Sequence, residues 1–596
     1  MKKNILLFIV DSLNYSRVKS SELELMPFLG ELERKGISCE NMFSQAPYTE
    51  AAVMNIYCGQ NVLSNGGYLR RFADAPLTVF EAMQQKGYKT FFNSLQPQCY
   101  PSSLSRGIDC PYYNVGYDLG AFWSYRLSHY SSVFHRGEMT DADYLMLEGI
   151  VEDNLREWIA ISDQTSKRAD PTNMIVDNAN GYNACAVCEA VTSEYNSFLS
   201  DKRAYVSELL EKGRAHSLYS IPAYVQNNKI KNRAKMEEIR GAVTPTLKRI
   251  RRMNRRLNLK NERGVFKGPM RKFGAFIKHP SKTSFKNFLK SGYLSYNALF
   301  DSDLYERIEG DYDLFKNAPS ARTHIDHYIE WAKTDNSDTP HFACIHVDDV
   351  HNPEVFFTYD SDDVELIKHE MADAESLLDT IPKDHSGSIT HLLSLRYIDG
   401  VIRYMYDMLE SEGMLDNTVI AICADHGFSF GGVPLRDSFV VNLYLENYNI
   451  PFVITGAGHE GLRLTDLRTS KDIPATLCDI ADGIIPEQFD GHSVIDTDGY
   501  SHVMIEYCGG GCPDLSRREL KIAAFDSNWF VGTLATVQQS VDDKTLSEIY
   551  DLKNDPLQLK NLVGKDYDRD AVERLSDVIR KRKAELLLET EQRAGI

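Results

Sequence analysis

The chain alternates short apolar runs with longer segments whose apolar residues recur at helical spacing. The run NILLFIV, residues 4–10, is apolar at nearly every position, which is typical of a strand buried on both faces of a parallel sheet. Residues 26–43 and 77–94 each predict a helix that ends at a glycine, Gly36 or Gly87, and is followed by a short strand. This alternation predicts an α/β fold with a mostly parallel central sheet and helices on both faces.

The alternation is lost after residue 110 and resumes near residue 336, which divides the chain into four segments. We expect residues 1–110 and 336–500 to form the two parts of one α/β core, and residues 111–335 to be a large helical and loop-rich insertion. From residue 501 short strands precede a final helix, which predicts a small C-terminal α+β subdomain over 501–596. In the second part of the core, the pattern predicts strands at 341–349, 417–427 and 451–456 and helices at 394–414 and 470–483.

The composition is that of a globular protein, with 43% hydrophobic and 25% charged residues among 596. The apolar run near the N-terminus stops at Asp11 without the small-residue cleavage site of a signal peptide. No other run approaches the roughly 18 apolar residues that would span a bilayer. We therefore expect a cytoplasmic protein whose eleven cysteines are reduced thiols.

The net charge of −19 is distributed unevenly along the chain. Residues 229–290 hold 20 Lys and Arg against three acidic residues, so this basic segment carries +17 and the rest −36. Within it, Leu247, Ile250, Met253 and Leu257 fall near one face of a predicted helix. One interpretation is a helical insert that packs this narrow apolar stripe on the acidic core. The alternatives are peripheral contact with a membrane or a lipid-linked substrate, binding of an anionic glycan, and, least favoured, nucleic acid, for which no recognised module is present.

Two predicted strands end in acidic residues, Asp11 after NILLFIV and Asp425 with His426 after TVIAICA. A single Asp after a strand is usually a helix cap or a turn residue. Two such ends at one edge of a sheet, with an imidazole, instead indicate a site for a divalent cation. Gly427 follows them and would let a neighbouring backbone approach closely.

Thr49 lies where the loop SQAPY meets the apolar segment EAAVMNIY. A threonine in this place is a good helix N-cap, worth about 1 kcal/mol. A hydroxyl at a helix N-terminus is also stabilised as an alkoxide, and a nearby cation would lower its pKa further. The sequence leaves both roles open, and they are compatible.

The order of these motifs resembles the sulfatase family of the alkaline phosphatase superfamily. The N-terminal half of that pattern is carried by ILLFIVDSL, MPFLGELERKGISCENMFSQAPYT and LTVFEAMQQKGYKT, and the second half by LDNTVIAICADHG, YLENYNIPFVITGAG and DIPATLCDIADGIIPEQFDGHSV. EIYDLKNDPLQLKNLV, residues 548–563, is similar to the signature of the family's C-terminal subdomain. The resemblance covers roughly residues 1–110 and 335–596 and implies an alkaline phosphatase-like fold.

The resemblance also implies roles for individual residues. It implies an enzyme whose nucleophile, Thr49, attacks a sulfate or phosphate ester beside a metal ion. His351 matches the histidine that contacts the ester oxygens or protonates the leaving group, and Arg436 lies roughly where a substrate-binding lysine is expected. One divalent metal is implied, with Mn or Zn favoured over Ca. A second would need Asp348 or Asp349 together with His351 and a further histidine such as His459 or His492. The metal ligands that the resemblance implies are Asp11, Thr49, Asp425 and His426.

Departures from the family pattern point to phosphate chemistry. Working sulfatases have Cys or Ser at the nucleophile position and Arg four residues later, so that the nucleophile is oxidised to formylglycine. This chain has Thr49 and Val53, and Ser12 stands where a second aspartate is usual. A threonine here resembles nucleotide phosphodiesterases, lipoteichoic acid synthases and phosphoethanolamine transferases.

We therefore predict a hydrolase or transferase acting on a phosphate ester, with a diester favoured. Its substrate is expected to be an anionic ester, carried by a lipid-linked or surface glycan. The alternatives are a sulfuric ester hydrolase that works without formylglycine and a catalytically inactive binding protein for an anionic glycan.

Overall fold

The structure is a computed structural model, and it describes most of the chain. The described residues are 2–21, 23–68, 72–94, 106–113, 130–167, 184–212, 233–260, 267–278, 280–282, 284–289, 320–335, 337–351, 356–382, 388–428, 443–495, 497–508, 515 and 519–594.

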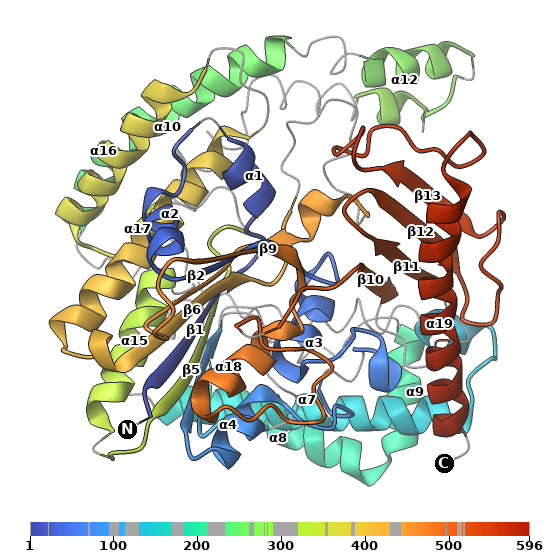
Figure 1. Ribbon diagram of the computed structural model, residues 1–596, viewed down its shortest axis with the longest axis horizontal. Coiled ribbons are helices and arrows are strands. Elements are labelled where there is room, and N and C mark those ends of the chain that lie inside the picture. Colours follow the sequence, from blue (N-terminus) through green and yellow to red (C-terminus); the bar gives the residue numbers. More distant parts are fainter. Residues whose placement is uncertain are drawn as a thin grey trace.

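A nine-stranded sheet forms the centre of the molecule (Figure 1). Its order is β4-β3-β5-β1-β6-β8-β2-β7, with β9 pairing β2. The strand β1 lies between β5 and β6, is parallel to both, and is fully buried from Ile5 to Val10. The strand β8 runs antiparallel to its neighbours β6 and β2. The other long strand pairs are parallel, so the prediction of a mostly parallel sheet is confirmed. The strands are β1 (Asn4–Val10), β2 (Ile37–Phe43), β3 (Lys89–Ser94), β4 (Cys110–Tyr113), β5 (His341–Val347), β6 (Thr418–Ala424), β7 (Asn449–Ile450), β8 (Phe452–Thr455) and β9 (Leu462–Thr469).

Helices cover both faces of this sheet, as the alternating pattern predicts (Figure 1). One layer holds α2 (Pro27–Lys35), α15 (Ala321–Thr334), α16 (Val364–Thr380) and α17 (Ile389–Ser411). The other holds α3 (Thr49–Cys58), α4 (Val79–Gln85) and α18 (Asp472–Asp482). The short helix α1 (Tyr15–Ser20) follows β1, and the 3-10 turns are η1 (Ser64–Gly66), η5 (Leu415–Asn417) and η6 (Leu445–Asn447).

Local sequence signals explain where these helices begin and end. Helix α2 starts with Pro27, and the Asp399 carboxylate on α17 accepts the backbone N–H groups of Phe28 and Leu29. It stops at Gly36, where a Cβ would lie only 2.1 Å from the carbonyl oxygen of Ile454. The chain therefore passes directly from α2 into β2 against β8.

The predicted insertion contains helices that pack on the core and one strand that extends it. The strand β4 pairs in parallel with β3, so the main sheet continues beyond residue 110. The division of the chain into four segments stays a prediction. The helices in this region are α7 (Asp141–Lys167), α8 (Ala184–Ser200), α9 (Lys202–Lys212), α10 (Arg233–Lys260) and α12 (Lys267–Lys278).

Helix α10 carries the first half of the basic segment and lies along α16 (Figure 1). Leu247 and Ile250 are buried, and Met253 is partly buried, as predicted for the apolar stripe. The Arg249 guanidinium forms ion pairs with Glu375 and Asp379, which lie on α16. The interpretation of an insert packed on acidic helices is therefore confirmed for α10.

A separate antiparallel sheet and a long helix form the C-terminal part, as predicted. Glu506 on this sheet accepts two hydrogen bonds from Arg582, both side chains being buried, and its backbone N–H donates to the Gln45 carbonyl at 2.9 Å. Its Oε1 also accepts the backbone N–H of Leu63 at 2.8 Å. These contacts fix the C-terminal sheet to the segments on either side of α3, the helix that begins at Thr49. The elements are β10 (Val503–Cys508), β11 (Leu520–Phe525), β12 (Trp529–Ala535), β13 (Leu546–Asp551) and α19 (Arg569–Ala594).

None of the helices in the described part of the chain has both the length and the apolar character that crossing a bilayer requires.

Candidate metal and nucleophile site

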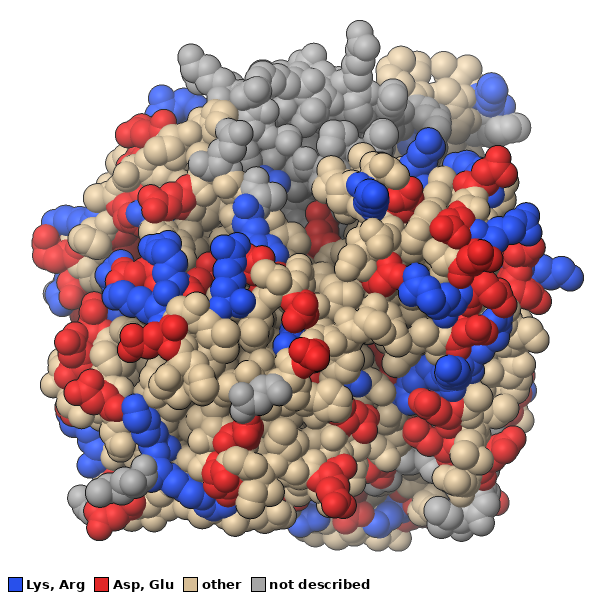
Figure 2. Space-filling model, in the orientation of Figure 1, with Lys and Arg blue, Asp and Glu red and all other residues tan. Residues whose placement is uncertain are grey.

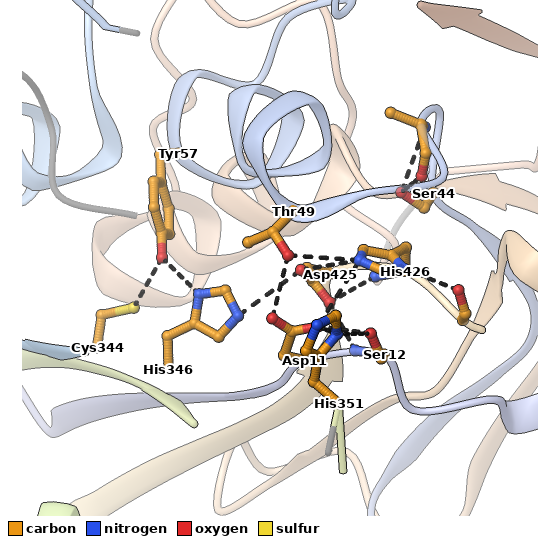
Figure 3. Close-up of polar contacts among 12 residues, drawn as sticks. Asp11, Ser12, Ser44, Thr49, Tyr57, Cys344, His346, His351, Asp425 and His426 are labelled. Carbon is orange, nitrogen blue, oxygen red and sulfur yellow. Dashed lines mark hydrogen bonds and ion pairs between the residues drawn. The ribbon is translucent and has the colours of Figure 1, made fainter. Parts of the chain in front are cut away.

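Three neighbouring strands bring polar side chains to one edge of the central sheet. Asp11 follows β1, Asp425 follows β6, and His346 lies near the end of β5. Each of these residues offers one ligand atom, and the three atoms lie within 4.8 Å of one another. All three side chains are at most 1% exposed. Figure 3 shows them pointing toward a common centre.

His346 was not among the ligands predicted from the sequence. It lies in HFACIHV, a strand in which every residue is buried. Its Nδ1 is 3.5 Å from the Tyr57 hydroxyl and its Nε2 is 3.7 Å from Asp425 Oδ2. A histidine inside an otherwise apolar parallel strand is unusual enough to be a signal, because burying a polar ring requires a partner.

The two carboxylates have opposite pKa shifts. Burial alone would raise the pKa of Asp11, but the charge of His351 and its contact with Asp11, together with the neighbouring imidazoles, outweigh burial and hold that pKa far below its usual range. Burial and the negative charge of Asp11 raise the pKa of Asp425. Two buried carboxylates this close repel each other, and a bound cation would relieve that repulsion.

The Thr49 hydroxyl faces this cluster and does not cap its helix. Thr49 is the first residue of α3, and the N-cap is Tyr48, whose side chain makes no capping hydrogen bond. The Thr49 hydroxyl donates to Asp11 Oδ2 at 3.0 Å and lies 3.4 Å from His426 Nε2 (Figure 3). The interpretation of Thr49 as a side-chain cap is therefore wrong, and its oxygen is held at the carboxylates.

His426 is held with one ring nitrogen toward the cluster. Its Nδ1 lies 2.7 Å from the Gly427 carbonyl, which fits an N–H donor at Nδ1. Its Nε2 then carries the lone pair and lies 3.7 Å from Asp11 Oδ1 and 3.6 Å from Asp425 Oδ2. This tautomer places a potential ligand atom beside both carboxylates.

Gly427 is required by a close approach of backbone. A Cβ at this position would lie 2.7 Å from the carbonyl oxygen of Glu446, and the Gly427 N–H donates to the Asn447 carbonyl at 2.8 Å. The Asp-His-Gly sequence thus turns sharply against the segment before β7. The turn fixes the orientation of His426.

Ser12, which is fully buried, and His351, which is half exposed, lie beside Asp11 at the rim of the site. Ser12 has a positive φ of 63°, an uncommon conformation for a residue other than glycine. Its hydroxyl lies 2.6 Å from Asp11 Oδ1 and 2.9 Å from His351 Nδ1, and its N–H donates to Asp425 Oδ1 at 3.1 Å. The Asp11 charge raises the pKa of His351 to about 9, although the side chain is 50% exposed. A cation at Asp11 would offset this charge and lower the His351 pKa again.

The sequence suggested three further residues, for substrate binding or a second metal. Arg436 lies outside the described residues. His459 lines a pocket with Lys2 and Lys3 at the opposite end of the sheet, and His492 stacks on Tyr500. A second metal site stays a prediction.

The donor set fits one divalent cation. His346 Nε2 and Asp425 Oδ2 are buried and make no hydrogen bond with any described residue. Such groups are costly to bury unless something compensates them. A mixed set of carboxylate oxygens and imidazole nitrogens suits Zn²⁺ or Mn²⁺ better than Ca²⁺, which prefers oxygen ligands.

Comparisons with known proteins agree on one family. The family model described as Sulfatase matches residues 3–171 and 256–484. The chain is 29% identical to the choline-sulfatase of Rhizobium meliloti (strain 1021) over 181 residues, which are 29% of this chain and 32% of that protein. It is 26% identical to the arylsulfatase of Clostridium perfringens (strain 13 / Type A) over 207 residues, 33% of this chain and 38% of that protein. The matches thus span about a third of the length of these relatives.

Among solved structures, the chain is similar to the phosphonate monoester hydrolase of Agrobacterium radiobacter. That similarity covers 99% of this chain and 96% of the other, with 14% sequence identity and a TM-score of 0.45.

Proposed function

The chain belongs to the sulfatase family of ester hydrolases, and from this premise we propose that it cleaves or transfers a phosphate ester through Thr49. The favoured substrate is a phosphodiester, carried by a lipid-linked or surface glycan. The observation that supports this most directly is the Thr49 hydroxyl, which points at Asp11 and His426 instead of capping its own helix.

The residues of the site divide the chemistry between them. A divalent cation held by Asp11, His346 and Asp425, with His426 beside them, would supply positive charge that polarises the ester and favours ionised oxygen nearby. The N-terminus of α3 adds a partial positive charge at Thr49. The buried setting strengthens both effects, because little water screens them.

The proposed reaction has two displacement steps. Thr49 Oγ1, which Asp11 orients through their hydrogen bond, gives its proton to solvent and forms a bond to phosphorus. The bond between phosphorus and the leaving oxygen breaks, and His351 at the rim protonates that oxygen. Water or a sugar or glycerol hydroxyl then attacks phosphorus and gives its proton to His351. The bond between phosphorus and Thr49 Oγ1 breaks, Oγ1 regains a proton from solvent, and hydrolysis or transfer is complete.

A diester fits this site better than a monoester. Val53 stands where the sulfatase pattern has an arginine, so the site lacks that cation. A monoester carries between one and two negative charges near neutral pH, whereas a diester carries one. The smaller charge on the diester requires less compensation from the protein.

The test is turnover of three aryl esters by protein that is stripped of metal and resupplied with Mn²⁺ or Zn²⁺. The substrates are bis-p-nitrophenyl phosphate, p-nitrophenyl phosphate and p-nitrophenyl sulfate. We expect metal-dependent diester cleavage that falls by about 10³-fold or more in Thr49→Ala. Thr49→Ser should keep a measurable part of it, because the hydroxyl remains.

A matched control is Thr78→Ala, because Thr78 is a true helix cap: its hydroxyl accepts the Glu81 N–H at the start of α4. This variant should lose about 1 kcal/mol of stability and keep its turnover. Sulfate turnover above phosphate turnover would instead indicate a sulfuric ester hydrolase working without formylglycine. No turnover with any metal, together with binding of an anionic glycan, would indicate a binding protein.

A further inference from the structure

The second half of the basic segment forms a small helical hairpin. Helix α12 is followed by a second helical stretch at residues 284–289. The Ser284 N–H donates to the Ser281 hydroxyl, which caps this stretch. Ring pairs join Phe273 to Phe288 at 5.1 Å and Phe276 to Phe285 at 5.3 Å, so the second stretch folds back along α12. We call the described residues of 267–289 the basic hairpin.

The basic hairpin exposes an unusual amount of apolar surface. Of the twelve large apolar side chains that are exposed in the described part of the chain, five lie in it. Exposed apolar groups that gather in one place mark an interaction surface, whereas scattered ones are normal. The five are Met270 at 67% exposure, Ile277 at 61%, Leu289 at 52%, Phe285 at 45% and Phe273 at 39%.

The same surface is purely cationic. Residues 267–290 contain seven Lys and Arg and no Asp or Glu. Lys272, Lys278, Lys282 and Lys286 are exposed. Figure 1 shows α12 at the upper right edge of the molecule, and Figure 2 shows tan and blue atoms there. The rest of the protein is strongly acidic and repels anions. An anionic partner would therefore be attracted to this surface and not to the molecule as a whole.

Helix α10 belongs to the same basic segment but is packed on the rest of the protein. Its apolar stripe is buried against the helical layer, and cations such as Arg249 and Lys235 pair with acidic side chains. The basic hairpin also combines lysines with apolar residues, but five of its large apolar side chains are exposed to solvent. Basic sequence alone therefore does not decide the role; the exposed apolar groups do.

We propose that the basic hairpin docks this protein on the surface of an anionic lipid bilayer. Apolar side chains such as Met270 and Ile277 would enter the boundary between headgroups and acyl chains, while the lysines contact anionic headgroups. A second copy of the chain fits less well, because two cationic hairpins repel each other. A soluble anionic glycan or a nucleic acid would use the lysines but not the exposed Met and Ile side chains.

The proposal does not depend on the chemistry at Thr49. If that chemistry is as proposed, docking would hold the enzyme at the surface where lipid-linked esters are found. In Figure 1, β1 runs upward from the N-terminus, and α12 lies at the upper edge of the molecule.

The test is co-sedimentation of the full chain with vesicles of phosphatidylcholine alone or mixed with phosphatidylglycerol. We expect binding only to the anionic vesicles, weakening as salt is raised. Lys272→Glu with Lys278→Glu should weaken binding by at least about 30-fold, at about 1 kcal/mol for each lysine lost near the surface. Met270→Ser with Ile277→Ser should weaken it by at least about tenfold, through lost apolar burial.

The matched control carries the same charge change on α10, Lys248→Glu with Arg252→Glu, where both side chains are exposed. It should bind within about twofold of the unchanged protein if the attraction is local. All variants should keep their thermal unfolding midpoint, because the altered side chains are exposed. Turnover of bis-p-nitrophenyl phosphate in solution is a separate readout, so failure of the proposed chemistry would not be mistaken for failure of docking.

Three results would overturn the proposal. They are no binding to anionic vesicles, equal weakening by the α10 control, and binding that survives loss of the apolar side chains. Self-association in sedimentation velocity that is abolished by Met270→Ser would assign the surface to a second copy instead. Retention on heparin or RNA without any vesicle binding would assign it to a soluble polyanion.

Discussion

The candidate metal and nucleophile site and the basic hairpin differ from ordinary protein burial in opposite ways. The site buries two carboxylates, Asp11 and Asp425, at 0% exposure. The hairpin leaves Met270 and Ile277 more than half exposed. Globular proteins normally bury apolar groups and expose charged ones, because water solvates charges well and apolar surface poorly.

The difference teaches what kind of partner each region is suited to bind. A buried cluster of carboxylates and imidazoles is complementary to a small cation that it can surround. An exposed surface of apolar groups and lysines is complementary to a large, flat and anionic partner with an apolar interior. Helix α10 satisfies both its apolar and its charged groups within the fold, and thus provides an internal reference.

The largest expected effect is that of removing one charge from the site. Asp425→Asn should lower metal-dependent turnover by on the order of 10³-fold, because the amide holds a cation poorly. The same change should raise the thermal unfolding midpoint of the metal-free protein, since it removes repulsion with Asp11. Kinetics and calorimetry of one preparation measure both effects.

The control for this substitution is Asp416→Asn, an exposed residue just before β6, at its other end. It should change neither quantity. Full turnover in Asp425→Asn would mean that Asp425 is not a metal ligand. The comparison between a buried cation site and the exposed basic hairpin would then fail.

The second prediction concerns metal removal. Chelation should lower the free energy of unfolding, and Mn²⁺ or Zn²⁺ should restore about 4 kcal/mol at a concentration a thousand times the Kd. His346→Ala should reduce this stabilisation, because it removes a ligand atom of the cluster. Denaturant titrations with and without metal provide the measurement. Equal restoration in His346→Ala would remove this residue from the site.

The third prediction compares two isoleucines of the basic segment. Ile250→Ala on α10 should cost about 3 kcal/mol, since that side chain is fully buried. Ile277→Ala on α12 should change stability by less than about 0.5 kcal/mol, since that side chain is 61% exposed. Urea unfolding followed by circular dichroism distinguishes them. Similar losses in both variants would show that the hairpin is packed in solution and would break the comparison.

The smallest effect should come from the ion pair between Arg249 and Glu375. Both side chains are about one-third exposed, so solvent screens their attraction. A double-mutant cycle with Arg249→Ala and Glu375→Ala should give a coupling of about 0.5 kcal/mol that falls as salt is raised. A coupling above about 2 kcal/mol would make α10 a charge-driven contact and a poor reference for the hairpin.

Several strands and helix ends could be predicted from the sequence, because several local signals agree there. The apolar run of β1 predicts a strand buried on both faces, and Gly36 predicts the end of α2; both are observed. Asp11, Asp425 and His426 were expected together because parallel strands end at one edge of a sheet, and the structure brings them together.

Two features of the site could not be predicted in the same way. The sequence marks His346 as an unusual residue in a buried strand, but it does not show which site the residue joins. The register of β5 against β1 decides that, because it pairs His346 with Ile9, two residues before Asp11. The choice between cap and nucleophile at Thr49 depends on where α3 starts, and a shift of one residue decides it. The separation of the basic segment into a packed helix and an exposed hairpin depends on tertiary contacts with α16, which composition does not encode.

The buried pair of Glu506 and Arg582 has a consequence for synthesis of the protein. The pair ties the C-terminal sheet to Gln45 and Leu63, on either side of the helix that starts with Thr49. During synthesis the chain contains all the candidate metal ligands, the last of them His426, long before Arg582 is added. The Thr49 segment gains its last anchor only then, so the order of synthesis delays a fully held nucleophile until nearly 600 residues have been joined.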